Sequence, residues 1–184
     1  MGPPAGGSGI GSGAGPGFLL LLMRHGEAAR TAGGGDRARP LTQQGRADVR
    51  SIAEAALRAG LRPARALVSP AGRARETAHV WAEALAGEIE VAEDEAIYEG
   101  GPEELLGRIR AHPPELATLL VVGHAPALPE LARSLARDRE VLRERLGGRF
   151  PPGTLVALAF PGAGPGSVER GAGEVRAVLP PGRS

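Results

Sequence analysis

Cysteine and lysine are both absent from this sequence of 184 residues. Without cysteine, neither a disulfide framework nor a thiolate metal site can form, and the redox character of the compartment stays undecided. Every one of the 22 basic residues is therefore arginine, beside 29 glycines and 17 prolines. This composition is typical of GC-rich coding, so the number of arginines says little about function and only their positions are informative.

A large charge of either sign is also missing, and so are long apolar runs. The formal net charge is +1, which indicates neither a nucleic-acid partner nor an acidic tail. The apolar run at residues 18–23 is too short to span a membrane, and no cationic segment precedes it as in a signal peptide. We therefore expect no nucleic-acid partner, no membrane partner and, by default, a cytoplasmic location.

The first 17 residues are composed almost entirely of glycine, proline, serine and alanine. Ile10 is their one large apolar side chain after Met1, so the segment cannot bury enough surface to offset the cost of ordering its backbone. Its glycine pattern precedes a predicted strand instead of linking a strand to a helix, which argues against a dinucleotide site. The sequence thus predicts a disordered tail at residues 1–17 and one domain at residues 18–184.

Within that domain, short apolar runs alternate with amphipathic stretches. Runs rich in leucine and β-branched residues predict strands, and apolar residues at helical spacing predict helices. Strands are predicted at 18–23, 64–69, 88–91, 118–122, 155–160 and 174–179; helices are predicted at 42–60, 69–85, 102–111, 128–136 and 139–146. Thr42 and Ser69 are the expected N-caps of the first two helices. This alternation predicts the α/β class: a single-domain three-layer sandwich with a mostly parallel central sheet and helices on both faces.

Cationic and imidazole side chains follow the predicted buried strands. Arg24 and His25 end the first strand, His124 ends the strand at 118–122, and Arg73 lies in the first turn of a helix. A cation near a helix N-terminus opposes the helix dipole unless an anion also binds there. Together with Arg39, these residues predict a pocket for a small dianion such as phosphate, because guanidinium groups bind it through planar paired hydrogen bonds.

Motifs for metals and nucleotides are not found. The sequence contains no His-x-x-x-His or His-Glu-x-x-His, and the glycine-rich segment 33–36 is not followed by Gly-Lys-Ser/Thr. We therefore expect no metal and no cofactor.

Four ordered segments resemble a known family. They are Leu21-Leu22-Met23-Arg24-His25-Gly26-Glu27-Ala28, Arg39-Pro40-Leu41-Thr42-x-x-Gly45, Ser69-Pro70-Ala71-Gly72-Arg73-Ala74-x-x-Thr77-Ala78 and Val121-Val122-Gly123-His124. They are similar to the signature of the histidine phosphatase (phosphoglycerate mutase-like) superfamily. The compact size and the Arg-Pro-Leu-Thr element are most similar to the SixA-type phosphohistidine phosphatases.

The resemblance implies a role for each matching residue. His25 would be the nucleophile that forms a phosphohistidine intermediate. Arg24, Arg73 and His124 would hold the phosphate oxygens, with Arg39 as a further anion contact. Fixed cations suit phosphoryl transfer because that reaction depends mainly on positioning and charge stabilisation. A backbone carbonyl bonded to the second nitrogen of His25 would fix its tautomer.

The residue that protonates the leaving group is left open. Family members that act on alkyl phosphates usually carry an acid for this step, and here Glu95, Glu99 or neither could serve. Ala125 stands where acid phosphatases of the family have aspartate directly after the second histidine.

The favoured function is a cofactor-independent phosphatase, with protein phosphohistidine as the preferred substrate. Its partner would be a phosphorylated protein or a small phosphorylated metabolite. Alternatives are a phosphatase of small phosphate esters, a phosphoglycerate mutase-like enzyme, for which the chain leaves little room for enclosing insertions, and an inactive phosphate- or phosphoprotein-binding module. The intact His25 argues against the last of these.

Overall fold

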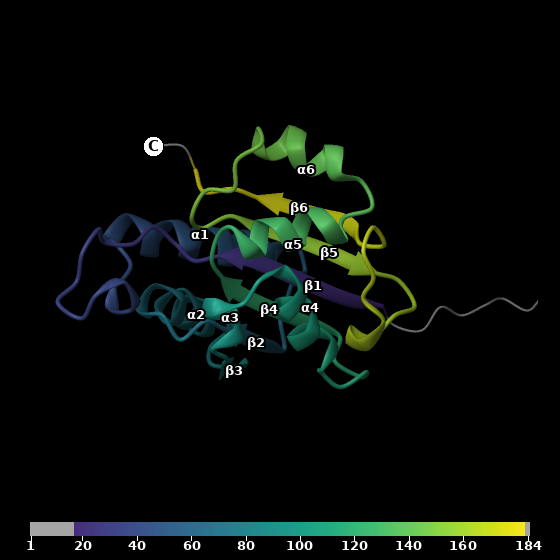
Figure 1. Cartoon of the computed structure of the whole chain (residues 1–184), viewed down its shortest axis with the longest axis horizontal. Coiled ribbons are helices and arrows are strands. Elements are labelled where there is room, and N and C mark those ends of the chain that lie inside the picture. The colour runs from purple at the N-terminus through teal and green to yellow at the C-terminus, as the bar shows by residue number, and fades with distance from the viewer. Residues whose placement is uncertain (1–16, 183–184) are drawn as a thin grey trace, which may run out of the picture.

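A computed structural model describes residues 17–182, so the predicted tail at 1–17 lies, apart from Gly17, outside the described residues. Six strands form one sheet: β1 (Phe18–Arg24), β2 (Arg65–Val68), β3 (Glu90–Glu93), β4 (Thr118–Gly123), β5 (Leu155–Phe160) and β6 (Glu174–Leu179). Their order across the sheet is β3-β2-β4-β1-β5-β6 (Figure 1). The predicted α/β class and the single domain are confirmed.

The sheet is mostly parallel, as the alternation of elements predicted. β3, β2, β4 and β1 are parallel neighbours, whereas β5 runs antiparallel to both β1 and β6. β1 and β4 lie in the middle of the sheet and are buried along most of their length, which is why both read as continuous apolar runs.

The helices are α1 (Gln43–Arg58), α2 (Gly72–Ala84), α3 (Ala96–Glu99), α4 (Pro102–Arg110), α5 (Ala127–Leu135) and α6 (Arg139–Leu146), with short 3₁₀ turns η1 (Asp36–Ala38) and η2 (Pro165–Ser167). α1 and α2 cover one face of the sheet, and α4, α5 and α6 cover the other (Figure 1). Side chains of β1 alternate between the two cores: Leu21 and Met23 pack toward α1 and α2, and Leu20 and Leu22 pack toward α4 and α5. The predicted three-layer sandwich is therefore confirmed.

The start of α2 differs from the prediction. Thr42 caps α1 as expected, since its side chain accepts a hydrogen bond from the Gly45 N–H. Ser69 was expected to cap α2 in the same way, but Ala71 is the capping residue and α2 begins at Gly72. The Ser69 hydroxyl oxygen accepts from the Ala71 N–H at 3.3 Å and lies 2.7 Å from His124 Nε2, so Ser69 joins the start of α2 to the site.

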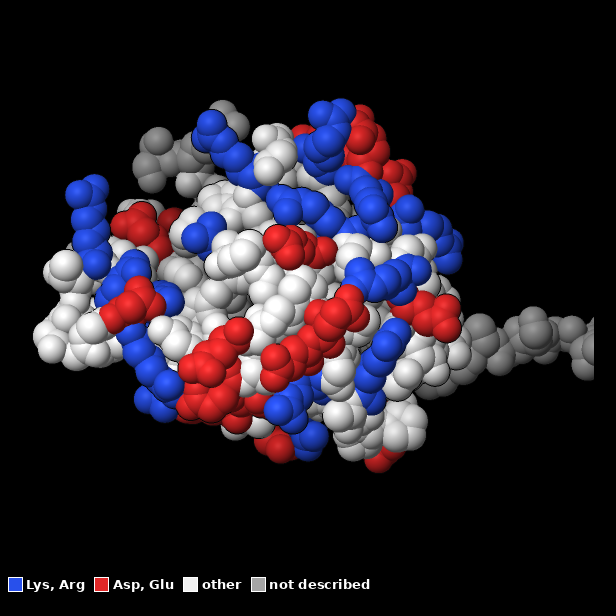
Figure 2. Space-filling view, in the orientation of Figure 1, with Lys and Arg blue, Asp and Glu red and all other residues white. Residues whose placement is uncertain are grey.

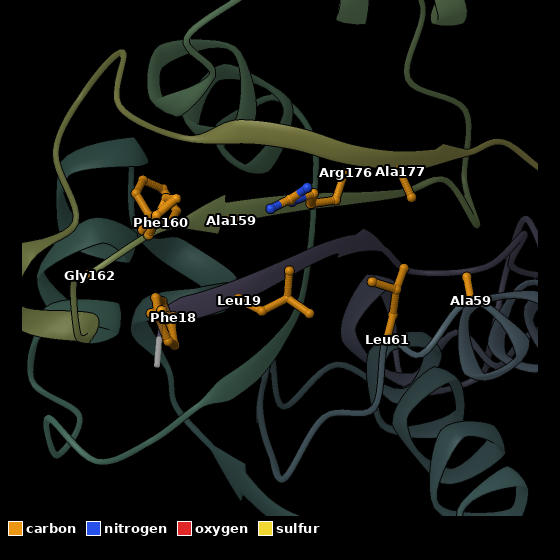
Figure 3. Close-up of a pocket in the computed structure, with 11 residues that line it drawn as sticks. Phe18, Leu19, Ala59, Leu61, Ala159, Phe160, Gly162, Arg176 and Ala177 are labelled. Carbon is orange, nitrogen blue, oxygen red and sulfur yellow. The ribbon is translucent and has the colours of Figure 1, made fainter. Parts of the chain in front are cut away.

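A shallow cavity of about 490 Å³ lies at the amino end of β1. Figure 3 shows it between β1, the segment after α1, and the ends of β5 and β6, with Leu19, Leu61 and Arg176 around it. Because β1 carries His25 after its other end, this cavity is on the opposite edge of the sheet from the predicted phosphate site. Among the described helices none is long and apolar enough to cross a membrane.

Candidate active site

The two central strands bring the two predicted histidines together. β1 and β4 pair in register with Arg24 opposite Gly123, so His25 and His124 both follow the carboxyl ends of adjacent parallel strands. The backbone N–H of His25 donates to the Gly123 carbonyl at 3.1 Å, and the two imidazole centroids are 5.0 Å apart. This is the edge where open α/β sheets bind ligands.

His25 is held in one tautomer. Its side chain is buried, with 7% of the residue exposed, and Nδ1 lies 2.7 Å from the Gly26 carbonyl oxygen. A carbonyl can only accept, so Nδ1 carries the proton and Nε2 carries a lone pair. The expected backbone carbonyl partner is thus present. A Cβ at Gly26 would lie 2.7 Å from Val49 Cγ2, so glycine is required for this tight turn.

Arg73 faces the lone pair of His25. Its Nε–H donates to His25 Nε2 at 3.2 Å, and its Nη2 lies 3.3 Å from His124 Nδ1. Only 6% of Arg73 is exposed. The Thr77 hydroxyl donates to the Arg73 carbonyl at 2.7 Å and accepts from the Gly26 N–H at 3.1 Å. Thr77 therefore ties the first turn of α2 to the turn that follows His25.

His124 is also oriented from both sides. Its Nε2 lies 2.7 Å from the Ser69 hydroxyl oxygen. Because the Arg73 guanidinium can only donate, His124 Nδ1 accepts and its Nε2–H donates to Ser69. The Tyr98 ring packs edge-on against the His124 ring at 5.3 Å. Ser69 is fully buried, and its hydroxyl oxygen also accepts from the Ala71 N–H at 3.3 Å, which fixes its position beside His124.

Burial and neighbouring cations keep both imidazoles neutral. Burial, with smaller contributions from His124, Arg73 and Arg24, lowers the pKa of His25 to about 3 against the opposing effect of the Gly26 carbonyl. Burial and Arg73 lower the pKa of His124 to about 4. Burial, followed by the charge of Arg73, also lowers the pKa of Arg24, although an arginine stays charged at neutral pH. Two neutral imidazoles thus stand between two guanidinium groups.

Arg24 is half-buried beside the histidine pair. Its Nη1 donates to the Phe150 carbonyl at 2.8 Å, while its buried Nε has no hydrogen-bond partner among the described residues. A buried guanidinium N–H without a partner costs free energy that a bound anion would recover. This observation supports an oxyanion as the missing partner.

Arg39 lies one contact away from the histidines. Its Nη1 donates to Asp36 Oδ1 at 2.7 Å and its Nε to the Ala29 carbonyl at 2.5 Å. The Asp36 carboxylate also accepts from Arg73 Nη2 at 3.0 Å and from the Tyr98 hydroxyl at 3.3 Å. The Asp36 carboxylate therefore bridges Arg39 and Arg73. That Arg39 itself contacts a bound anion stays a prediction.

Asp36, Ser69 and Tyr98 are the site residues that sequence reasoning missed. No local pattern gives Asp36 a role, and the sequence predicts only a capping role for Ser69, because their partners at the site lie far away in the chain. The hydrogen bond from Arg39, with a smaller effect from the hydrogen bond of Arg73, holds the pKa of Asp36 below its usual range. This carboxylate therefore stays ionised. Its position three residues before the Arg-Pro-Leu-Thr element is the one sequence signal that could have found it.

Both candidate acids lie at the surface of the protein. Glu95 pairs with Arg37 on the surface, and 61% of its side chain is exposed. Glu99 is exposed at the end of α3. The described residues contain no group of three or more His, Cys, Asp or Glu side chains that could hold a metal ion. The arrangement is suited to nucleophilic attack on a phosphorus atom by His25 Nε2, with charge stabilisation supplied by the surrounding guanidinium groups.

Comparisons with known proteins agree with this geometry. Residues 20–115, more than half of the chain, match the model of the histidine phosphatase superfamily (branch 1). The chain belongs to the histidine phosphatase superfamily. An uncharacterized protein of Mycobacterium tuberculosis, Rv1276c, is 33% identical over 145 residues, which cover 76% of this chain and 88% of that protein.

Two solved structures are similar along nearly the whole chain. A candidate phosphohistidine phosphatase SixA from Nakamurella multipartitia is 28% identical with a TM-score of 0.74, covering 91% of this chain and 98% of that one. The protein histidine phosphatase SixA complexed with tungstate is 25% identical with a TM-score of 0.66, covering 88% and 96%. Family and neighbours together show a SixA-like histidine phosphatase, which confirms the family and the phosphatase activity that the motifs predicted.

Proposed function

We propose that this histidine phosphatase removes phosphate from phosphohistidine on another protein, through a phosphohistidine intermediate on its own His25. The observation that carries the intermediate is the pairing of His25 Nδ1 with the Gly26 carbonyl, which leaves the Nε2 lone pair facing the Arg73 guanidinium. A phosphate bound by Arg73 would place its phosphorus atom next to that lone pair.

The proposed reaction has two steps. In the first, His25 Nε2 attacks the phosphorus of a phosphohistidine whose other ring nitrogen carries a proton. The P–N bond to the substrate imidazole breaks, and the imidazole leaves neutral with the bonding electron pair. Arg24, Arg73 and His124 stabilise the charge on the phosphate oxygens. In the second step, water attacks the phosphorus of phospho-His25, the bond to Nε2 breaks, and inorganic phosphate leaves.

The choice of substrate follows from the leaving group. An alkoxide is strongly basic and needs a proton donor, which contributes about 10²–10⁴-fold in rate. Glu95 is bonded to Arg37 on the surface, and Asp36 is held ionised, so neither is ready to donate a proton. An imidazole is a far weaker base than an alkoxide, and its departure makes a smaller demand on a proton donor.

The experiment compares kcat/KM on a phosphorylated histidine-containing transfer domain with kcat/KM on simple alkyl phosphates. We expect the phosphohistidine protein to be preferred by about 10²-fold or more, since the missing general acid costs that much on esters. Glu95→Gln and Glu99→Gln should each leave the rate on phosphohistidine unchanged within about threefold.

A preference for alkyl phosphates, lost in one of the two Glu→Gln variants, would replace this proposal with a small-molecule ester phosphatase. His25→Ala serves as the control in both assays, because it removes the proposed nucleophile and leaves both glutamates in place.

A further inference from the structure

Four arginines on α5, α6 and the following loop have no acidic partner among the described residues. Most arginines of the described residues lie within 4 Å of a carboxylate, as Arg62 does with Glu88 and Arg65 with Glu90. Over the same residues 17–182, the arginines without such a partner include Arg133, Arg139, Arg145 and Arg149, which are all exposed. Composition bias accounts for the number of arginines in the chain but not for this grouping.

Three of these arginines line one groove. Arg133 on α5, Arg139 on α6 and Arg149 after α6 border a cavity of about 270 Å³ between the two helices, with Leu142 and Leu146 among its apolar walls. Glu140 also lines it, but Arg143 binds that carboxylate. The groove therefore offers apolar walls with a surplus of positive charge around them.

Arg139 is in an unfavourable place for an isolated helix. It is the first residue of α6, where a cation opposes the helix dipole and only the capping residue Asp138 and Glu140 offset it. The dipole explains cations in the last turn of α6, such as Arg145, but not one in its first turn. An anionic partner at the groove would stabilise Arg139 there.

The segment that follows α6 connects the groove to the phosphate site. Phe150 lines the groove, and its carbonyl accepts the hydrogen bond from Arg24 Nη1 at 2.8 Å. Three residues later, the Gly153 N–H donates to the His25 carbonyl at 2.9 Å. One short segment thus borders the groove on one side and the proposed nucleophile on the other.

The opposite side of the site carries the opposite charge. Figure 2 shows arginines over α5 and α6, with some carboxylates beside them at α6, and carboxylates gathered over α3 and α4. The sheet order puts β1 and β4, with the two histidines, between β3, which leads into α3, and β6, against which α6 packs. A protein bound over the histidines would therefore meet a positive surface on the β6 side and a negative one on the β3 side.

We propose that the arginine groove between α5 and α6 binds an acidic segment of the phosphorylated partner protein, in which carboxylates flank the phosphohistidine. This inference rests on the proposed function and names the kind of partner that the site accepts. Charge complementarity of this type acts mainly on association, so it raises kcat/KM and makes it sensitive to salt.

The experiment uses the full chain and three substrates: a phosphohistidine protein with Asp and Glu around the phosphorylated residue, the same protein with those residues changed to Asn and Gln, and phosphoimidazole. The test variant is Arg133→Gln/Arg139→Gln. The matched control is Arg58→Gln/Arg62→Gln, which removes the same charge from exposed arginines at the end of α1 and just beyond it. Each kcat/KM is measured at low and at high NaCl.

We expect the groove variant to lose about tenfold in kcat/KM on the acidic substrate at low salt, with the loss disappearing at high salt. Its rates on the neutralised substrate and on phosphoimidazole should match those of the wild type. An equal loss on all three substrates, no loss on any, or the same loss in the control variant would overturn the groove proposal. Absence of wild-type activity on every phosphohistidine and on phosphoimidazole would instead overturn the proposed function.

Discussion

At the scale of single residues, the site depends on two imidazoles that are kept neutral and turned in fixed directions. His25 has one nitrogen committed to the Gly26 carbonyl, and His124 has one committed to Ser69. Arg73 lies against the remaining nitrogen of each. The side chains are thus arranged before a substrate arrives, which lowers the reorganisation that phosphoryl transfer requires.

Neutral His25 makes the fold sensitive to acid. The pKa of His25 is about 3 in the folded chain and near 6.5 in the unfolded chain, so below pH 6.5 only the unfolded state takes up the proton. Stability from this residue is fully present above pH 6.5 and falls as the pH drops toward 3, by up to about 1.4 kcal/mol per pH unit. Urea unfolding of wild type and His25→Asn at pH 7 and pH 5 measures this contribution.

We expect the unfolding free energy of the wild type to fall by about 1–2 kcal/mol more than that of His25→Asn between those two pH values. An identical fall in both proteins would mean that His25 is already protonated in the fold at pH 5, contrary to the neutral imidazole described above.

The sequence predicted which residues meet at the site better than it predicted how they are held. Arg24, His25, Arg73 and His124 could be found because each follows a recognisable apolar run or helix start. The bonds from Asp36 to Arg73 and to Tyr98 could not, because they join residues 37 and 62 positions apart. Such contacts depend on how segments that are distant in the sequence come together in the fold, and a local sequence pattern does not predict this.

At the scale of helices and strands, the best predictions were the elements whose ends are sharply marked in the sequence. β5, β6 and α6 have the predicted bounds, because apolar periodicity in each is interrupted sharply by glycine, proline or charged residues. β3 begins two residues later than predicted, since its residues are mostly exposed at the sheet edge and lack an apolar pattern. α3, four residues long, is too short to give a periodic signal.

Gly45 shows how closely one helix approaches the site. A Cβ built on Gly45 would lie 2.1 Å from the carbonyl oxygen of Glu27, two residues after His25. Gly45→Ala must therefore push the His25–Glu27 turn away from α1. We expect a loss of about 1–3 kcal/mol in stability from overpacking and of about 10²-fold in kcat/KM from misplacing the nucleophile.

Gly107→Ala is the matched control, because Gly107 lies inside α4 and a Cβ there meets no atom within 4 Å. This variant should be unchanged in rate and more stable by about 0.5–1 kcal/mol. Thermal unfolding and steady-state rates of both variants test the comparison, and a fully active Gly45→Ala enzyme would contradict the close approach.

At the scale of the whole molecule, β5 is important because it runs antiparallel to β1. It places the segment before Leu155 at the carboxyl end of β1, where the Phe150 carbonyl reaches Arg24. The sequence predicted a mostly parallel sheet but could not say which strand would reverse, because both orientations suit the same apolar run.

The first residues of the chain are expected to be dispensable. Residues 2–17 offer almost no apolar surface, so their removal should change neither the melting temperature nor the catalytic rate beyond experimental error. Differential scanning calorimetry and rate measurements on the truncated protein check this. A fall of several degrees in melting temperature would mean that this segment packs on the domain.

The central claim, that His25 is the nucleophile, is tested most directly by trapping the enzyme during turnover. Rapid quenching followed by mass spectrometry should find phosphate on His25, bonded to Nε2 because Nδ1 is engaged with Gly26, and this phosphate should be labile in acid and stable in base. His25→Ala should retain no more than a few per cent of the wild-type rate. Phosphate on a different residue, or substantial turnover by His25→Ala, would contradict the account.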